Sequence, residues 1–228
     1  DDVNITDKDG AAIPFQAKPT AYWPDGSIKW LLVDLQADVD QTGEKEIFVE
    51  YGQGAEKERL LRSPPRDSLA MTGEKETLAL NTGALKAVMG KDKFDLMGVV
   101  YVDANADGNY TAEERILNGG DMYVMHKNKR FLASLDKEPR IEVEVEGHQR
   151  TSVKRSGWFV AEDGSKFCKF ILRIETFKGK PYVRLYHTFI YTGYPENKFY
   201  ERYEGLPLPK NETVQEFGIL VPANIQGN

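Results

Sequence analysis

The chain has 228 residues, of which 40% are hydrophobic and 29% are charged, and its formal net charge is −6 at pH 7. This acidic balance argues against a nucleic-acid partner, and no run of about 18 apolar residues is present that could span a membrane as a helix. The length allows one large or two modest domains, and the single cysteine, Cys168, excludes an internal disulfide framework.

The first part of the chain predicts short β-strands around one prominent turn. Residues 22–35 read YWPDGSIKWLLVDL, in which two apolar arms flank a Pro-Asp-Gly-Ser turn at 24–27. The second arm is apolar on both faces, which predicts a strand in the middle of its sheet. Residues 47–51 alternate and predict a half-buried strand. The first residues supply no clear opening strand, so we expect residues 1–55 to form a small, incomplete barrel-like domain.

The middle and end of the chain predict a linker and then a larger domain. Residues 56–76 are charged, contain a Pro-Pro pair and show no period, so we interpret them as a linker, with one long surface loop as the alternative. From residue 77 onward, alternating strands and hairpin turns, such as the one at 162–165, predict an antiparallel β-sandwich over 77–228. No helix is predicted, and the predicted fold class is all-β.

One acidic loop carries a candidate metal site. Residues 103–114 read DANADGNYTAEE, which fits the EF-hand-type spacing of oxygen ligands at positions 1, 3, 5, 7, 9 and 12 of a loop. Gly108 would allow the sharp turn at the sixth position. A strand pattern at 94–102 precedes the loop where a true EF-hand has a helix. The spacing predicts one Ca²⁺, and a metal-free turn is the alternative. The predicted ligands are Asp103, Asn105, Asp107, Asn109, Thr111 and Glu114.

Histidines and arginines offer weaker candidates for chemistry. His187 lies on the apolar face of its strand, where it would be either a core residue or a catalytic base. His126 and His148 have no Cys or His partners at zinc-ligand spacing, so no zinc site is predicted. Arg173 and Arg184 could neutralise a uronate carboxylate, or could form ordinary surface ion pairs.

Aromatic residues offer two candidate sugar-binding surfaces. Tyr22, Trp23 and Trp30 could stack on sugar rings or could belong to the core. A second surface would be formed by the cluster Tyr191, Tyr194, Tyr200 and Tyr203.

Two stretches carry a resemblance to a known family. Pro14-Phe15-Gln16 followed by residues 22–34 has the pattern P-x-Q … W-P-D-G-S-x-K-W, and residues 182–189 read YVRLYHTF. The first resembles the N-terminal region of the exo-acting rhamnogalacturonan lyase/YetA-like family, and the second is similar to a strand of that family's central β-sandwich. The resemblance implies a barrel-like domain followed by the sandwich, and the calcium-type loop suits it. By itself the signature reads as structural, made of turn formers and buried aromatics.

The resemblance also implies a function. It indicates a secreted, periplasmic or cell-surface bacterial protein that acts on acidic plant or algal polysaccharide. Such enzymes cleave by β-elimination, in which a base removes the proton beside the uronate carboxyl group, a cation neutralises that group and an acid assists the leaving oxygen. Family members are longer, with a C-terminal α/α-toroid domain that lines the active cleft. This chain shows no helical region, so we expect a non-catalytic fragment or short relative, attached to a missing α/α domain.

No catalytic residue is carried over from the family. Two alternatives stay open. The chain could be a stand-alone carbohydrate-binding or cell-surface β-module, or it could be a complete small lyase that uses His187 or a tyrosine together with Arg184.

Overall fold

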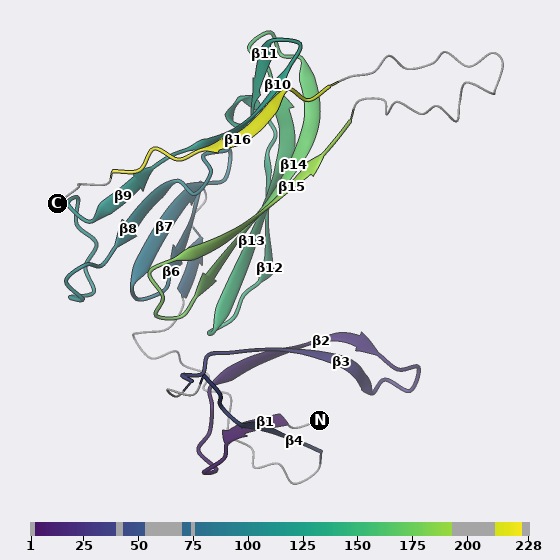
Figure 1. The fold of residues 1–228 in the computed structure, drawn as a ribbon, viewed down its shortest axis with the longest axis vertical. Coiled ribbons are helices and arrows are strands. Elements are labelled where there is room, and N and C mark those ends of the chain that lie inside the picture. Colours follow the sequence, from purple (N-terminus) through teal and green to yellow (C-terminus); the bar gives the residue numbers. More distant parts are fainter. Residues whose placement is uncertain (1–2, 40–42, 53–69, 74–75, 193–212, 225–228) are drawn as a thin grey trace.

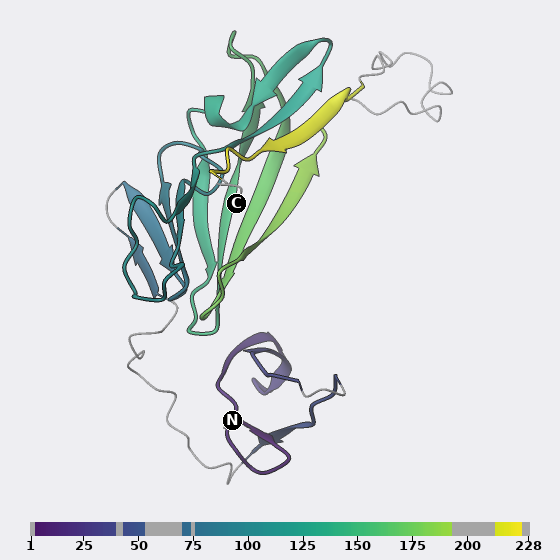
Figure 2. The ribbon, with the colours of Figure 1, turned by 60° about the vertical axis from the view of Figure 1, so that its left-hand side comes forward.

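The structure is a computed structural model that describes residues 3–39, 43–52, 70–73, 76–192 and 213–224. Within these ranges the chain forms four antiparallel sheets and a single 3-10 turn, η1 (Ala133–Leu135) (Figures 1 and 2). The all-β prediction is therefore confirmed. The described residues include no helix that is long and apolar enough to cross a membrane.

The smaller sheet of the sandwich contains five strands. In spatial order they are β5 (Ala70–Gly73), β6 (Thr77–Asn81), β7 (Leu85–Gly90), β8 (Val99–Val102) and β9 (Arg115–Asn118). Most of the linker predicted at 56–76 lies outside the described residues. Its later part, however, contains β5, which pairs along β6 from Ala70 opposite Asn81 to Gly73 opposite Leu78.

The larger sheet contains seven strands and packs against the smaller one (Figure 1). Its main path is β15 (Val183–Ile190), β14 (Lys166–Phe177), β13 (Arg150–Val160), β11 (Lys129–Leu132), β10 (Asp121–His126) and β16 (Glu216–Leu220), and β12 (Arg140–Val145) also pairs with β13. The predicted hairpin at 162–165 joins β13 to β14. Its Ala161 and Gly164 close the turn with backbone hydrogen bonds.

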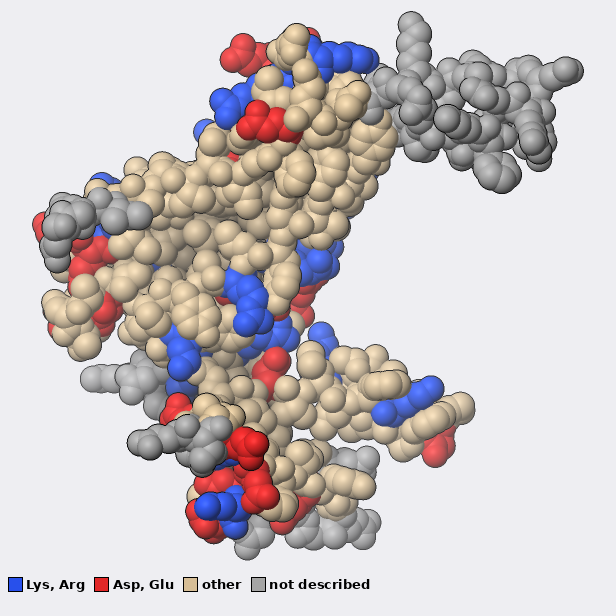
Figure 3. Space-filling model, viewed as in Figure 1, with Lys and Arg blue, Asp and Glu red and all other residues tan. Residues whose placement is uncertain are grey.

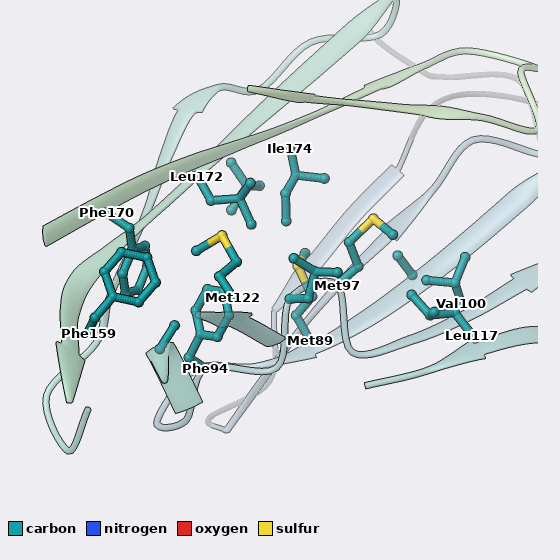
Figure 4. Packing of buried hydrophobic residues seen from close by; sticks show 14 of the residues in the cluster. Met89, Phe94, Met97, Val100, Leu117, Met122, Phe159, Phe170, Leu172 and Ile174 are labelled. Atoms are coloured by element: carbon teal, nitrogen blue, oxygen red, sulfur yellow. The ribbon is translucent and has the colours of Figure 1, made fainter. Parts of the chain in front are cut away.

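The core of the sandwich lies between these two sheets. Alternate residues of β7 and β14 point inward because side chains alternate across a strand. Phe94 and Phe170 meet edge-on with ring centroids 4.9 Å apart, and Phe159 packs beside Phe170 at 5.3 Å (Figure 4). Cys168, the only cysteine of the chain, is fully buried there, as its inward position on the strand predicts.

The strand predicted at 94–102 is wrong in its first half. Only Val99–Val102 forms β8, because Leu96 and Gly98 have positive φ angles of 50° and 66° and break the extended path. Gly98 is required there, since a Cβ on it would overlap the carbonyl group of Val88. Phe94 and Leu96 are both buried in the core.

The N-terminal residues form two small ribbons. β1 (Val3–Asp7) pairs with β4 (Ile47–Tyr51), and β2 (Phe15–Tyr22) pairs with β3 (Ile28–Leu35). An opening strand is thus present, although the sequence did not indicate one.

Two predictions about burial in this part are wrong. β3 is not central, because within the described residues it pairs with β2 alone, and its Trp30 is 64% exposed. β4 is exposed along its whole length rather than half-buried. In both cases the described residues provide no second layer to cover the apolar side chains.

Candidate functional site

The β2–β3 hairpin is joined to the sandwich through the side-chain amide of Gln16. Its Nε2 donates to Asp34 Oδ2 at 3.1 Å and to the carbonyl oxygen of Arg150 at 3.2 Å. Its Oε1 accepts from the backbone amides of Gln149 at 2.8 Å and Arg150 at 2.9 Å. Both donors and both acceptor positions of the amide are therefore in use. Gly147 makes this approach possible, since a Cβ on it would collide with the Gln16 side chain.

An ion-pair network lies next to this amide. Arg150 donates from Nε and Nη2 to the two carboxylate oxygens of Asp34, at 2.8 and 3.1 Å, and from Nη1 to Glu175 at 2.7 Å. Burial lowers the pKa of Arg150, but hydrogen bonds and charge from Asp34 and then Glu175 outweigh it and raise that pKa. Gln36 adds a further link by donating to the carbonyl oxygen of Lys178 at 3.0 Å.

Sequence reasoning missed the role of Gln16 and Asp34. Both belong to the family signature, which by itself predicts only a packing role for them. For Asp34 the available signal was a carboxylate on a largely apolar strand, because a half-buried carboxylate needs a partner. That partner, Arg150, lies 134 residues beyond Gln16.

A cleft of about 470 Å³ opens beside the junction. One wall comes from β2 and β3, including Lys18 and Leu32, and the other from residues 144–150, including Glu146 and His148. Figure 3 shows the surface hollowed between the projecting hairpin and the sandwich. The volume lies in the range of small-ligand pockets.

The predicted calcium loop connects β8 to β9, and its first half is tightly turned. The carboxylate of Asp103 accepts from the backbone amides of Asp107 at 3.1 Å and Gly108 at 2.8 Å. Asn105 Oδ1 also accepts from the amide of Asp107, and Asp107 Oδ1 accepts from the amide of Asn109 at 2.7 Å. Gly108 has a φ of 79°, which the turn requires. The first four predicted ligands are therefore drawn together.

The second half of the loop is closed by Glu114. Its Oε2 accepts from the Thr111 amide at 3.0 Å, and its Oε1 accepts from the Ala104 amide at 3.1 Å. Tyr110 ties the loop to the smaller sheet by donating to Asn81 Oδ1 at 2.7 Å. Burial, together with the charges of Asp103 and Glu114, raises the pKa of Tyr110. Both ends of the predicted ligand set therefore lie near this ring.

The donor set in the loop consists only of oxygen atoms, which suits a hard cation. As placed, no three Asp, Glu, His or Cys side chains of the described residues gather closely enough to form a metal site. The carboxylates instead accept backbone N–H bonds. A bound cation would have to draw the Asp103, Asp107 and Glu114 oxygens toward one point.

Two of the histidine candidates are packed against aromatic rings, whereas His148 lines the cleft. The buried Nε2 of His187 has no hydrogen-bond partner among the described residues, and its ring contacts Phe159 and Phe217. Burial lowers the pKa of His187. His126 is stacked on Phe167, and its Nδ1 lies 2.8 Å from the carbonyl oxygen of Thr213.

The arginine candidates are engaged by neighbouring residues. Arg173 holds Glu144 through two hydrogen bonds of 2.7 and 3.0 Å. Arg184 donates to the Tyr186 hydroxyl at 3.2 Å and lies over the ring of Phe177. Arg173 is therefore engaged in an ion pair, whereas the side chain of Arg184 remains 56% exposed.

The first candidate aromatic surface lies within the described residues, whereas most of the second lies outside them. Tyr22, Trp23 and Trp30 are all more than half exposed, so the interpretation of the signature aromatics as buried core is wrong. Trp23 also carries Lys29 over its ring at 4.3 Å. Of the tyrosine cluster at 191–203, only Tyr191 lies within the described residues, where it meets Phe167 edge-on.

Fold and junction together define a two-part β-protein, in which a small N-terminal unit is fixed to an antiparallel sandwich. Comparison with protein families gives this class an identity. Residues 1–49 match the PcRGLX-like N-terminal RIFT barrel domain, and residues 69–206 match the PcRGLX-like protein central beta sandwich domain. The chain therefore belongs to the PcRGLX-like, rhamnogalacturonan lyase-like family, which confirms the family predicted from the signature.

A curated relative shows how much of a longer protein the chain corresponds to. The chain is 26% identical over 179 residues to the uncharacterized protein YetA of Bacillus subtilis (strain 168). The matched region covers 76% of this chain and 19% of YetA. The chain thus spans about a fifth of the length of this relative.

Proposed function

We propose that this chain is the non-catalytic, carbohydrate-binding part of a secreted polysaccharide lyase-like protein that acts on rhamnogalacturonan-like acidic polysaccharide. The observation that carries the proposal is the match of both domains, in order, to the PcRGLX-like family. The correspondence to about a fifth of YetA supports a role as one portion of a larger protein.

The packing of His187 argues against a complete small lyase that uses this residue as its base. A β-elimination base must reach a substrate proton. The Nε2 of His187 is buried, has no hydrogen-bond partner among the described residues and lies among the rings of Phe159 and Phe217. Under this proposal the base and the acid come from other parts of the full protein.

The binding role is tested by sedimentation of the chain with insoluble rhamnogalacturonan, while ultraviolet absorbance reports any unsaturated product. We expect the chain to sediment with the polysaccharide without forming product. Product formation by the chain alone would replace the proposal with the small-lyase alternative. If the chain does not sediment with the polysaccharide, the carbohydrate-binding part of the proposal is wrong.

The second part of the proposal is that one Ca²⁺ binds the loop at 103–114 and fixes it between β8 and β9. Asp103, Asp107 and Glu114 would supply carboxylate oxygens, and Asn109 would supply its backbone carbonyl. The support is the all-oxygen donor set and the turn at Gly108. A single loop of this kind would bind in the range of roughly 10⁻⁴–10⁻³ M.

Calorimetry on chelator-treated protein tests the calcium site. We expect heat on addition of Ca²⁺ and a higher melting temperature, because an ion that binds only the folded state stabilises it. Glu114→Gln should lose both effects. Glu113→Gln is the matched control, since the neighbouring glutamate is not in the ligand set. Absence of both heat and a melting shift in the unmodified chain would contradict the site.

A further inference from the structure

The two walls of the cleft, the β2–β3 hairpin and residues 144–150, are held in place relative to each other. Some polar side chains on these walls have no partner among the described residues. Gln16, Asp34 and Arg150 hold its two walls together through satisfied hydrogen bonds and ion pairs. The inner end of the cleft is therefore already saturated and adds little binding capacity. Recognition must come from the side chains farther out along the walls.

Three polar side chains of the walls are available. Lys18, Glu146 and His148 line the cleft, and none of them makes a hydrogen bond or ion pair with a residue that the structure describes. By contrast, Glu144 is held by Arg173. Lys18 and His148 could meet a carboxylate, and Glu146 could accept hydrogen bonds from hydroxyl groups.

An apolar strip continues outward from these groups. Leu32 pairs with Lys18 across the hairpin and is 42% exposed. Trp30 follows two residues earlier on the same face of β3, because side chains alternate along a strand, and it is 64% exposed. A sugar ring offers the matching pattern, with an apolar C–H face for Trp30 and polar groups at its rim.

We infer that this cleft binds a uronate-containing unit of an oligosaccharide, with Trp30 stacked on a sugar ring and Lys18 paired with the uronate carboxylate. The inference rests on the proposed function for the ligand class and adds the site. The ligand enters between the two domains, so both contribute contacts. Because the junction is fixed by Arg150, the walls need little rearrangement on binding.

The test is calorimetric titration of the 228-residue chain with a soluble tetrasaccharide of alternating rhamnose and galacturonate. Trp30→Ala should weaken binding roughly tenfold, the loss expected for one stacking contact. Lys18→Gln should also weaken it roughly tenfold. In addition, this variant should no longer prefer the acidic oligosaccharide over its carboxyl-reduced form, which a purely structural role of Lys18 would not change.

Tyr51→Ala is the matched control, because Tyr51 is an 83% exposed aromatic residue that lies on β4 and not on the β2–β3 hairpin. It should bind as the unmodified chain does. If the unmodified chain binds and the Trp30 and Lys18 variants bind equally well, the cleft is not the binding site. The proposed function would still stand. No binding by the unmodified chain to either the tetrasaccharide or the polymer would overturn both.

Discussion

Removing the partner of the buried Arg155 should destabilise the sandwich more than any surface ion-pair change. Arg155 is only 1% exposed, and its guanidinium group donates to Asp95, to the carbonyl oxygen of Gly90 at 3.1 Å and to that of Lys93 at 2.6 Å. It also lies over the ring of Phe94. Burial lowers its pKa, and Asp95 is the charge that opposes this effect.

The magnitude follows from leaving that charge unpaired. Breaking a buried ion pair by removing one partner costs about 3–5 kcal/mol. The side chain of Asp95 is 29% exposed, so water can partly replace it, and we expect Asp95→Ala to cost about 3 kcal/mol. For a protein of this size, that corresponds to a fall of roughly 6–12 °C in melting temperature.

The assay is thermal and urea unfolding of Asp95→Ala, Arg155→Met and the double variant. The double variant should be more stable than Asp95→Ala alone, because replacing both partners by apolar groups removes the uncompensated charge. Glu142→Gln, which removes the exposed partner of Lys154, should leave the melting temperature unchanged within error. Strictly additive costs of the two single changes would refute the reasoning, since they would show that the two groups do not interact.

Three further changes test other parts of the molecule. Burial lowers the His187 pKa, so below pH 6.5 the unfolded chain binds a proton more readily than the folded chain, and stability falls on acidification. His187→Leu should remove this loss, which is measured as the difference between the melting temperatures at pH 5.5 and pH 7.5. Arg173→Gln should reduce stability throughout the range above pH 4.5 and flatten its decline in more acidic solution. The reason is that Arg173 lowers the pKa of Glu144, so its contribution is present above the unfolded value and lost as the pH falls; melts from pH 3 to 6 follow it. Tyr110→Phe should cost about 1 kcal/mol in urea unfolding, because the hydrogen bond to Asn81 is lost.

Strands with one buried face could be predicted from the sequence. In β14, Phe170, Leu172 and Ile174 share one face, and all three are buried as expected, while the outward positions include the charged residues Lys169, Arg173 and Glu175. A period of two with one apolar face fixes both the strand and its orientation. The turn after β13 was equally clear, because its Gly164 has the positive φ that such a turn needs.

Burial in the N-terminal ribbons could not be predicted in the same way. The apolar composition of β3 shows that the strand can be covered, but coverage depends on a second surface that the composition does not specify. Trp30 and Leu32 are exposed for this reason. Arg155 shows the opposite case: a cation at an inward position is buried because Asp95 and two carbonyl groups, about 60 residues earlier in the chain, surround it.

The two ends of the signature hairpin have different structural roles, and the residues between them have neither role. At the tip, the hydroxyl and amide of Ser27 bond to Asp25, lower its pKa and close the turn, and Gly26 takes a φ of 85°. At the base, Gln16 and Asp34 attach the hairpin to the sandwich. A motif that served packing alone would bury its aromatic residues. Here the anchored base and the closed tip hold the hairpin in place while Tyr22, Trp23 and Trp30 stay exposed among the described residues, so the hairpin offers aromatic surface that a ligand could contact.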